Sequence, residues 1–544
     1  MAIPKPGADG IINRTGKSYI LVSEIIEQKE RALCMDFNVV RQGVCVNELI
    51  YEGSMEQAVD SDITLPDYCP DIQRILKCCI SPQVTGTQSA GGRITVEGTV
   101  LIRLIYVCEQ GRVHCFEQSQ PFSRFVEVSE MPQDVCVKVQ ARTEYVNCRA
   151  VSQRRIDVHA SVTLTVRASA PCSEELIDQA EGGGVQIRRS CVPVSSVRTC
   201  TQRSFTVSEV MELGHSQPQI SQIISTSSCI RVQDIKVIPN KILLKGELEI
   251  KTLYCSEESS DPAEKITNCI PISQILEAEG IDEQCSSDVR LDVTCLEVTP
   301  KSDAEGELRL LDITARICAS VCAYVEAQAP MVTDVYSTAY DLNAERKIVR
   351  LSRLTDIFTD TTLCKGTLEI PGADLSGVVD VWSGGVTVSV SVKEDQIVLS
   401  GTVTVCMLTI DSSGELQYME RQTDYEYVRR MEGGASAACD PSVSVHAMDY
   451  VMGGDGRIDV RIELSITASV FEMVEKKVVS GISLLEEHPK QAPDAALTIY
   501  YCDAGENVWD IAVKYNTTVQ AIMGENKLTE ETVPEKCMLL IPSA

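Results

Sequence analysis

The sequence lacks the residue patterns that are typical of zinc-binding, membrane-spanning and secreted proteins. It has five histidines among 544 residues, and its 24 cysteines form no C-x-x-C pair, so the usual spacing of zinc ligands is absent. No window approaches the roughly 18 uncharged residues of a membrane span. The first 34 residues contain no apolar run of the roughly 7–15 residues that a secretion signal needs. We therefore expect no metal site, no membrane insertion and no export.

Positive charge is also scarce. The chain has 49 Lys and Arg against 78 Asp and Glu, which gives a formal net charge of −29. A chain this acidic repels phosphate groups, so nucleic acid is not an expected partner. Neither G-x-S-x-G nor H-E-x-x-H occurs, and the glycines of the near phosphate-loop pattern from Gly10 to Ser18 are one residue too far apart. We expect no catalytic residues and no cofactor.

The cysteines have two interpretations. Many fall in strand-like runs, such as Cys108, Cys318 and Cys406, where a reduced cysteine packs as a small apolar residue. Oxidative cross-linking is the alternative. The sequence leaves both open.

What the sequence does have is a strand pattern that occurs three times. Residues 94–106 (ITVEGTVLIRLIY) place apolar side chains at alternate positions, as in a strand with one buried face. Gly98 lies in phase with the buried set, which is typical of a bulge or a close approach of backbones. Gly246 follows Gly98 by 148 residues in a second copy, and Gly401 follows Gly246 by 155 in a third. Self-similarity over this distance indicates a duplicated domain.

A short apolar triplet precedes each of these glycines. Asp71 lies 27 residues before Gly98, and the same spacing recurs in the other two copies. In the first copy Ile72, Ile75 and Leu76 would share one face of a helix that begins near Pro70. The sequence therefore predicts short helices alongside the strands.

These patterns divide the chain. We expect an N-terminal tail at 1–44, repeats at 45–170, 205–330 and 351–472, linkers at 171–204, 331–350 and 473–496, and a last module at 497–544. Three consecutive glycines and nearby arginines favour a solvated connector in the first linker. The expected fold class is mainly β, with three tandem β-sandwich-like repeats.

In the last module the spacing of apolar residues is no longer that of strands alone. Residues 500–515 indicate a strand, a glycine turn and a helix, for which Asn507 is a candidate N-cap. Thr518–Met523 would be a second short helix, and Met538–Pro542 a closing strand. The predicted module is thus a compact β-α-α-β unit with Trp509 in its core.

This module resembles the LysM domain. The resemblance rests on Tyr501, Gly505, Trp509, Ile511, Ala512, Lys514, Tyr515, Asn526, Leu528, Leu540, Ile541 and Pro542. LysM domains bind N-acetylglucosamine chains between the turn before the first helix and the loop after the second. The residues that the resemblance implies for contact with a glycan or a protein are Gly505, Glu506, Asn507, Val508, Met523, Gly524, Glu525, Asn526 and Lys527. Of these, Glu506, Asn507 and Val508 differ from the usual Asp-Thr-Leu of the family.

The repeats resemble the SPOCS domain. The resemblance rests on Leu65-Pro66-Asp67, Pro70-Asp71-Ile72, Ile75-Leu76, Val96-Glu97-Gly98, Tyr106 and Pro121-Phe122-Ser123, and it is weaker in the second and third copies. SPOCS repeats followed by a LysM module resemble the clostridial spore-coat morphogenetic proteins.

This resemblance implies a non-enzymatic coat scaffold. Such a protein is expected first in the mother-cell cytoplasm and then in the spore coat at the forespore surface. Its LysM module would dock on the coat's basement ATPase, and its repeats would meet other coat proteins. The alternative is a peptidoglycan-binding protein of the cortex or wall, which would bind N-acetylglucosamine polymers.

Overall fold

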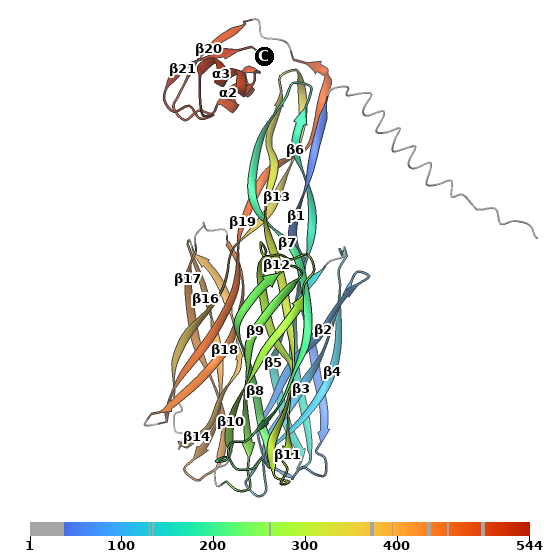
Figure 1. The fold of residues 1–544 in the computed structure, drawn as a ribbon, viewed down its shortest axis with the longest axis vertical. Coiled ribbons are helices and arrows are strands. Elements are labelled where there is room, and N and C mark those ends of the chain that lie inside the picture. The colour runs from blue at the N-terminus through green and yellow to red at the C-terminus, as the bar shows by residue number, and fades with distance from the viewer. Residues whose placement is uncertain are drawn as a thin grey trace, which may run out of the picture.

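The structure is a computed structural model that describes residues 37–543, except for 130, 133–134, 260–262, 370–374, 394, 432–436, 454–455 and 491–494. Most of the predicted N-terminal tail therefore lies outside the described residues. A broad base of strands carries a narrow stalk, and a small module lies at the far end of the stalk (Figure 1). The mainly β class is confirmed, and both described helices belong to the last module. Neither of them has the length and apolar character to cross a membrane.

Three successive units follow one plan of strands. Unit 1 contains β1 (Asn38–Thr64), β2 (Ile72–Ala90), β3 (Arg93–Cys108), β4 (Val113–Glu127), β5 (Cys136–Ser152) and β6 (Arg155–Glu181). Unit 2 contains β7 (Val185–Glu212), β8 (Gln222–Ile238), β9 (Lys241–Cys255), β10 (Glu264–Glu277), β11 (Ser286–Ser302) and β12 (Leu308–Ser337). Unit 3 contains β13 (Tyr340–Glu369), β14 (Leu375–Val386), β15 (Ser389–Lys393), β16 (Gln396–Asp411), β17 (Leu416–Arg430), β18 (Ala437–Met452) and β19 (Arg457–Pro489), with β14 and β15 in the place of one strand.

Each unit packs one sheet on another. The first, last and fifth strands form the sheets β1-β6-β5, β11-β12-β7 and β13-β19-β18. The second, third and fourth strands form β2-β3-β4 and β10-β9-β8, and in unit 3 β16 pairs with β14, β15 and β17. In unit 1, Ile94 and Val96 of β3 share a core with Val158 and Leu164 of β6. The alternation that the sequence shows is therefore the buried face of each sheet.

The three repeated glycines occupy the same place in their units, on the central strands β3, β9 and β16. A Cβ atom at any of them would collide with a neighbouring main-chain carbonyl oxygen, that of Gln83 on β2, Arg231 on β8 or Thr387 between β14 and β15. At Gly246 the distance would be 2.7 Å. The strand register shifts nearby, between Val84 and Gly86 in unit 1. The prediction of a bulge or a close approach of backbones is confirmed.

The helix predicted at Ile72–Leu76 is wrong, because these residues begin strand β2. The register of β2 against β3 shifts between Ile72 and Arg74 and again between Ile75 and Lys77. Two bulges so close together break the period of two. The remaining spacing of apolar residues then imitates that of a helix.

The three units meet around a common apolar cluster in the base. Ile105, Leu253 and Leu408, each seven residues after its unit's glycine, pack together in it. Leu76 of the predicted triplet and Val379, at the corresponding position of unit 3, pack against the same cluster. The outward face of each central strand is thus covered by the other two units.

A charged junction also joins the units. Lys138 Nζ of unit 1 lies 2.6 Å from Oδ2 of Asp440 in unit 3, and Arg290 Nη2 of unit 2 lies 3.2 Å from the same oxygen. Burial by itself would raise the pKa of Asp440, but Arg290 and Lys138 outweigh it, so the pKa is lowered overall. The junction therefore holds a charged carboxylate between two cations from different units.

The stalk is built from the ends of the first and last strands of each unit. These ends form three antiparallel ribbons, β1 with β6, β7 with β12, and β13 with β19. The ribbons pack around Val44, Val46, Leu176, Val192, Val194, Ala329, Met331, Val349, Leu351 and Val478. Residues 171–204, predicted as a solvated linker, instead form β6 and β7 apart from a short turn, and most of 331–350 and 473–489 are also strand. The glycines at 182–184 form the turn between β6 and β7, each with a positive φ.

Candidate protein-docking site

The last module has the predicted order of elements. It contains β20 (Leu497–Cys502), α2 (Val508–Tyr515), α3 (Val519–Asn526) and β21 (Cys537–Pro542). Asn507 caps α2 as predicted, because its side-chain oxygen accepts the backbone N–H of Trp509 at 2.8 Å. Trp509 is 4% exposed and lies in the core of the module.

The module is fixed to the stalk through the end of β12 and the turn that leads from it to β13. Trp509 donates its indole N–H to Asp334 at 2.9 Å. Tyr336 donates its hydroxyl to the carbonyl of Thr517 at 2.7 Å, and its ring packs edge-on against Trp509 with the centroids 5.0 Å apart. Asn516 donates to the carbonyl of Thr338 at 2.8 Å. These attachments use α2 and the residues that follow it.

The predicted contact residues before α2 are held within the module. Gly505 has a φ of +89° in the turn, and Val508 is fully buried. Glu506 accepts the hydroxyl of Tyr500 at 3.2 Å. Main-chain bonds tie this segment to residues 531–533, as in the 2.7 Å bond from Val508 N–H to the carbonyl of Glu531. Asn507 and Glu506 therefore have structural roles.

Asn526, in the second predicted segment, joins α3 to β21. Its side-chain amide donates to the carbonyl of Leu540 and accepts the N–H of the same residue, both at 2.7 Å. Met523 is half-buried, whereas Gly524, Glu525 and Lys527 are exposed. The second predicted segment is hydrogen-bonded to β21, and the first, before α2, is hydrogen-bonded to residues 531–533. The role of both segments in binding stays a prediction.

An exposed apolar row on β20 was not among the predicted contact residues. Leu497, Ile499 and Tyr501 are 45%, 57% and 74% exposed. The strand register places Leu540 opposite Ile499 and Met538 opposite Tyr501, and Met538 is 51% exposed. We call these five side chains the outer sheet face. Their period of two was visible in the sequence and could have identified them.

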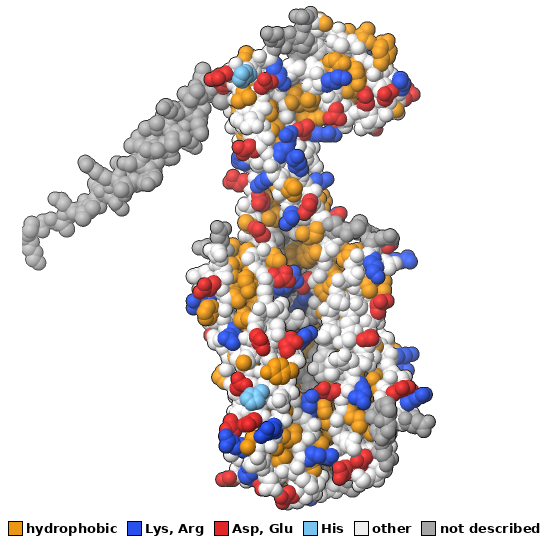
Figure 2. Space-filling model, turned by 180° about the vertical axis from the view of Figure 1, so that it is seen from behind, with side chains coloured by type: hydrophobic (Ala, Val, Ile, Leu, Met, Phe, Trp, Pro, Cys, Tyr) orange, Lys and Arg blue, Asp and Glu red, His pale blue; other side chains and the backbone are white. Residues whose placement is uncertain are grey.

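This small sheet also has an open edge. Within the described part of the chain it consists of β20 and β21 alone, so β20 has an unpaired side. The far side of β21 is covered at Leu540 by the amide of Asn526. On the face drawn in Figure 2, the module shows apolar side chains interspersed with charged ones of both signs.

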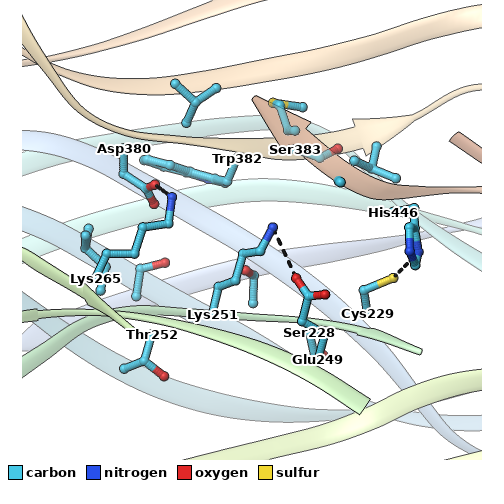
Figure 3. Close-up of a pocket in the computed structure, with 17 residues that line it drawn as sticks. Ser228, Cys229, Glu249, Lys251, Thr252, Lys265, Asp380, Trp382, Ser383 and His446 are labelled. Carbon is cyan, nitrogen blue, oxygen red and sulfur yellow. Dashed lines mark hydrogen bonds and ion pairs between the residues drawn. The ribbon is translucent and has the colours of Figure 1, made fainter. Parts of the chain in front are cut away.

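A polar cleft lies between units 2 and 3 (Figure 3). It encloses about 160 Å³, less than the roughly 300 Å³ at which ligand pockets begin. Lys265 pairs with Asp380, and Lys251 Nζ lies 3.3 Å from Glu249. The charged side chains of the cleft therefore largely neutralise one another.

Cys229 and His446 face each other in the same cleft, 3.4 Å apart. The other ring nitrogen of His446 contacts the guanidinium of Arg231, which can only donate. His446 Nδ1 must then carry the proton and donate it to the sulfur, so it has no lone pair facing the thiol. Burial raises the pKa of the Cys229 thiol. The pair is therefore not arranged as a nucleophile and its base.

Two tyrosines fix the segments that lead into β2 and β8. The hydroxyl of Tyr106 donates to the carbonyl of Pro70 at 3.1 Å, and that of Tyr254 donates to the carbonyl of Pro218 at 3.2 Å. Both tyrosines are fully buried. They lie eight residues after Gly98 and Gly246, where unit 3 has Thr409.

Residues 71–151 and 219–301 match the family model of the SipL SPOCS domain. Each match begins 27 residues before the central glycine of its unit. The first covers β2 to β5 and the second covers β8 to β11. The SPOCS resemblance is thereby confirmed for units 1 and 2, and it supports a SipL-like protein of the spore coat. No curated protein and no solved structure matches the chain.

Proposed function

We propose that this chain is a non-enzymatic scaffold of the spore coat whose last module docks on the coat's basement ATPase. Units 1 to 3 would be sandwich-like SPOCS repeats that meet other coat proteins, and the last module would be a LysM domain. The protein would be made in the mother-cell cytoplasm and recruited to the forespore surface. The SPOCS matches in units 1 and 2 support the coat role.

The outer sheet face is the observation that carries the docking proposal. Its most exposed side chains, Ile499, Tyr501 and Met538, would gain free energy when a partner removes them from water, at roughly 25 cal/mol per Å². The unpaired side of β20 can in addition accept a strand from the partner, since open edges bind extended segments through main-chain hydrogen bonds. The attachment through α2 leaves this surface at the tip of the molecule.

Binding of the purified full chain to the coat ATPase tests the proposal. We expect the double variant Ile499→Ser and Tyr501→Ser to weaken binding at least tenfold, about 1.4 kcal/mol, because it removes the apolar contact surface. The melting temperature should stay unchanged, since both side chains are exposed. Ile275→Ser is the matched control, because Ile275 is 55% exposed on β10 of unit 2.

Unchanged binding by the double variant would show that the outer sheet face is not the docking surface. Titration with N-acetylglucosamine oligomers tests the alternative, a peptidoglycan-binding protein of the cortex or wall. Saturable binding of these sugars, with no binding of the ATPase, would replace the scaffold proposal by the peptidoglycan one.

A further inference from the structure

Three sulfur atoms meet at the boundary between units 1 and 2. Cys200 on β7 and Cys322 on β12 are direct cross-strand partners and form a disulfide. Cys136, at the start of β5, places its Sγ 3.9 Å from Sγ of Cys322. All three sulfurs lie within 4.8 Å of one another. Two of them therefore belong to unit 2, and the third belongs to unit 1.

Residues from all three units surround Cys136. Lys138 on the same strand and Asp440 on β18 are the charged groups that act on its thiol. Tyr324 on β12 is the neighbouring phenol, and its own pKa is raised mainly by burial. Burial also raises the pKa of the Cys136 thiol, and Lys138 offsets only part of this effect. The thiol is thus mainly protonated at neutral pH.

Other neighbouring cysteines differ from this site. Cys502 and Cys537 are direct cross-strand partners whose sulfurs lie 3.5 Å apart. Cys78 and Cys148 are hydrogen-bonded thiols of unit 1. A bond at either pair would link two strands of one unit or module. Cys136 is different, because it offers an existing disulfide a second partner across a boundary between units.

We propose that Cys136, Cys200 and Cys322 form a thiol–disulfide exchange site that can link unit 1 covalently to unit 2. The thiolate of Cys136 attacks Sγ of Cys322, the bond from Cys322 to Cys200 breaks, and Cys200 leaves as a thiolate. The proton that Cys136 loses to solvent is balanced by the one that Cys200 takes up. One disulfide replaces another, so no oxidant or reductant is consumed.

The two disulfides differ in what they hold together. The bond from Cys200 to Cys322 joins β7 and β12, which already pair along most of their length. The bond from Cys136 to Cys322 would join two strands that belong to different sheets. It would keep units 1 and 2 together even where the side-chain contacts between them loosen.

Disulfide mapping of the full chain tests this proposal. The protein is treated with diamide, which oxidises two thiols to a disulfide while it is itself reduced, and is then acidified, alkylated and digested without reduction. Cys200→Ser should carry the bond from Cys136 to Cys322, and Cys136→Ser only the bond from Cys200 to Cys322. Cys191→Ser, at an exposed cysteine, should give the wild-type pattern.

Exchange in the wild-type protein should speed up with pH. The thiolate is the attacking species, and burial raises the pKa of Cys136, so the thiolate fraction rises up to about tenfold per pH unit in the neutral to alkaline range. If Cys200→Ser keeps the wild-type circular dichroism and melting temperature but forms no bond from Cys136 to Cys322, the proposal is overturned.

A metal site is the competing outcome, since three thiolates also suit soft metal ions. Zn²⁺ alone is added to the reduced full chain, and binding is followed by equilibrium dialysis. Stoichiometric binding that is lost in Cys136→Ser, together with no exchanged disulfide on oxidation, would assign the three sulfurs to metal binding and reject exchange. No stoichiometric binding, together with the exchanged disulfide, supports the proposal.

Discussion

The outer side of a sheet is buried in the base but exposed to solvent in the last module. In the base, the outward side chains of Ile105, Leu253 and Leu408 are 3%, 4% and 2% exposed, because the three units cover one another. In the last module, Ile499 and Tyr501 on the outer side of β20 are 57% and 74% exposed. Three copies of one unit supply their own cover, whereas the described residues supply none for the module. A partner that covered this face would be another chain or a segment outside the described residues.

The largest effect is expected from a substitution in the apolar cluster where the three units meet. Leu408→Ala should lower the free energy of unfolding by about 2–5 kcal/mol, because it leaves a cavity where the three units meet. Ile499→Ala on β20 is the matched control and should change it by no more than about 0.5 kcal/mol. Urea denaturation of both variants measures the difference. Equal losses would mean that the two surfaces are not distinct.

A pair of glycines gives an intermediate effect. Gly98→Ala should destabilise unit 1 by about 1–3 kcal/mol through overpacking, since its Cβ would collide with the Gln83 carbonyl and the Phe122 ring. Gly524→Ala on α3 meets no atom within 4 Å and should stabilise its helix by roughly 0.5–1 kcal/mol. Thermal unfolding shows both changes. A tolerated Gly98→Ala would contradict the close approach at the bulge.

The smallest of the three expected losses of stability concerns the predicted contact residues. Asn526→Ala should destabilise the last module by about 1–2 kcal/mol, because the N–H and carbonyl of Leu540 lose their partner. Hydrogen exchange at β21 would report this loss. Lys527→Ala, at an exposed neighbour, should leave exchange and ATPase binding unchanged. Weaker binding by Lys527→Ala without a change in exchange would favour the predicted loop as the contact.

The repeats could be predicted from the sequence because the pattern that identifies them lies within a short stretch of the chain. The alternation in β3, β9 and β16 survives intact, and a glycine in phase with it fits a bulge wherever it occurs. The last module was predictable for the same reason, since Asn507 and the helical faces lie within one short segment. Each of these features needs only neighbours along the chain.

What the sequence did not reveal depends on partners far away along the chain. The triplet Ile72, Ile75 and Leu76 looked helical because bulges against β3 reset its phase. Residues 171–204 have the glycines and arginines that are typical of a linker. Val192 and Val194 nevertheless alternate as in a strand, and they face the other two ribbons in the stalk. In both places the deciding contacts are made by strands of other sheets or units.

The ribbons of the stalk also determine how the protein would respond to tension. The last module follows β19, which runs antiparallel to β13 for the whole length of the stalk and on into the base. A pull on the module along the stalk loads the hydrogen bonds of this ribbon in shear, since they lie perpendicular to the strands. Bonds loaded in shear must yield together rather than one after another. Under such a pull the ribbon would therefore resist unravelling and would pass the force from the tip to the base.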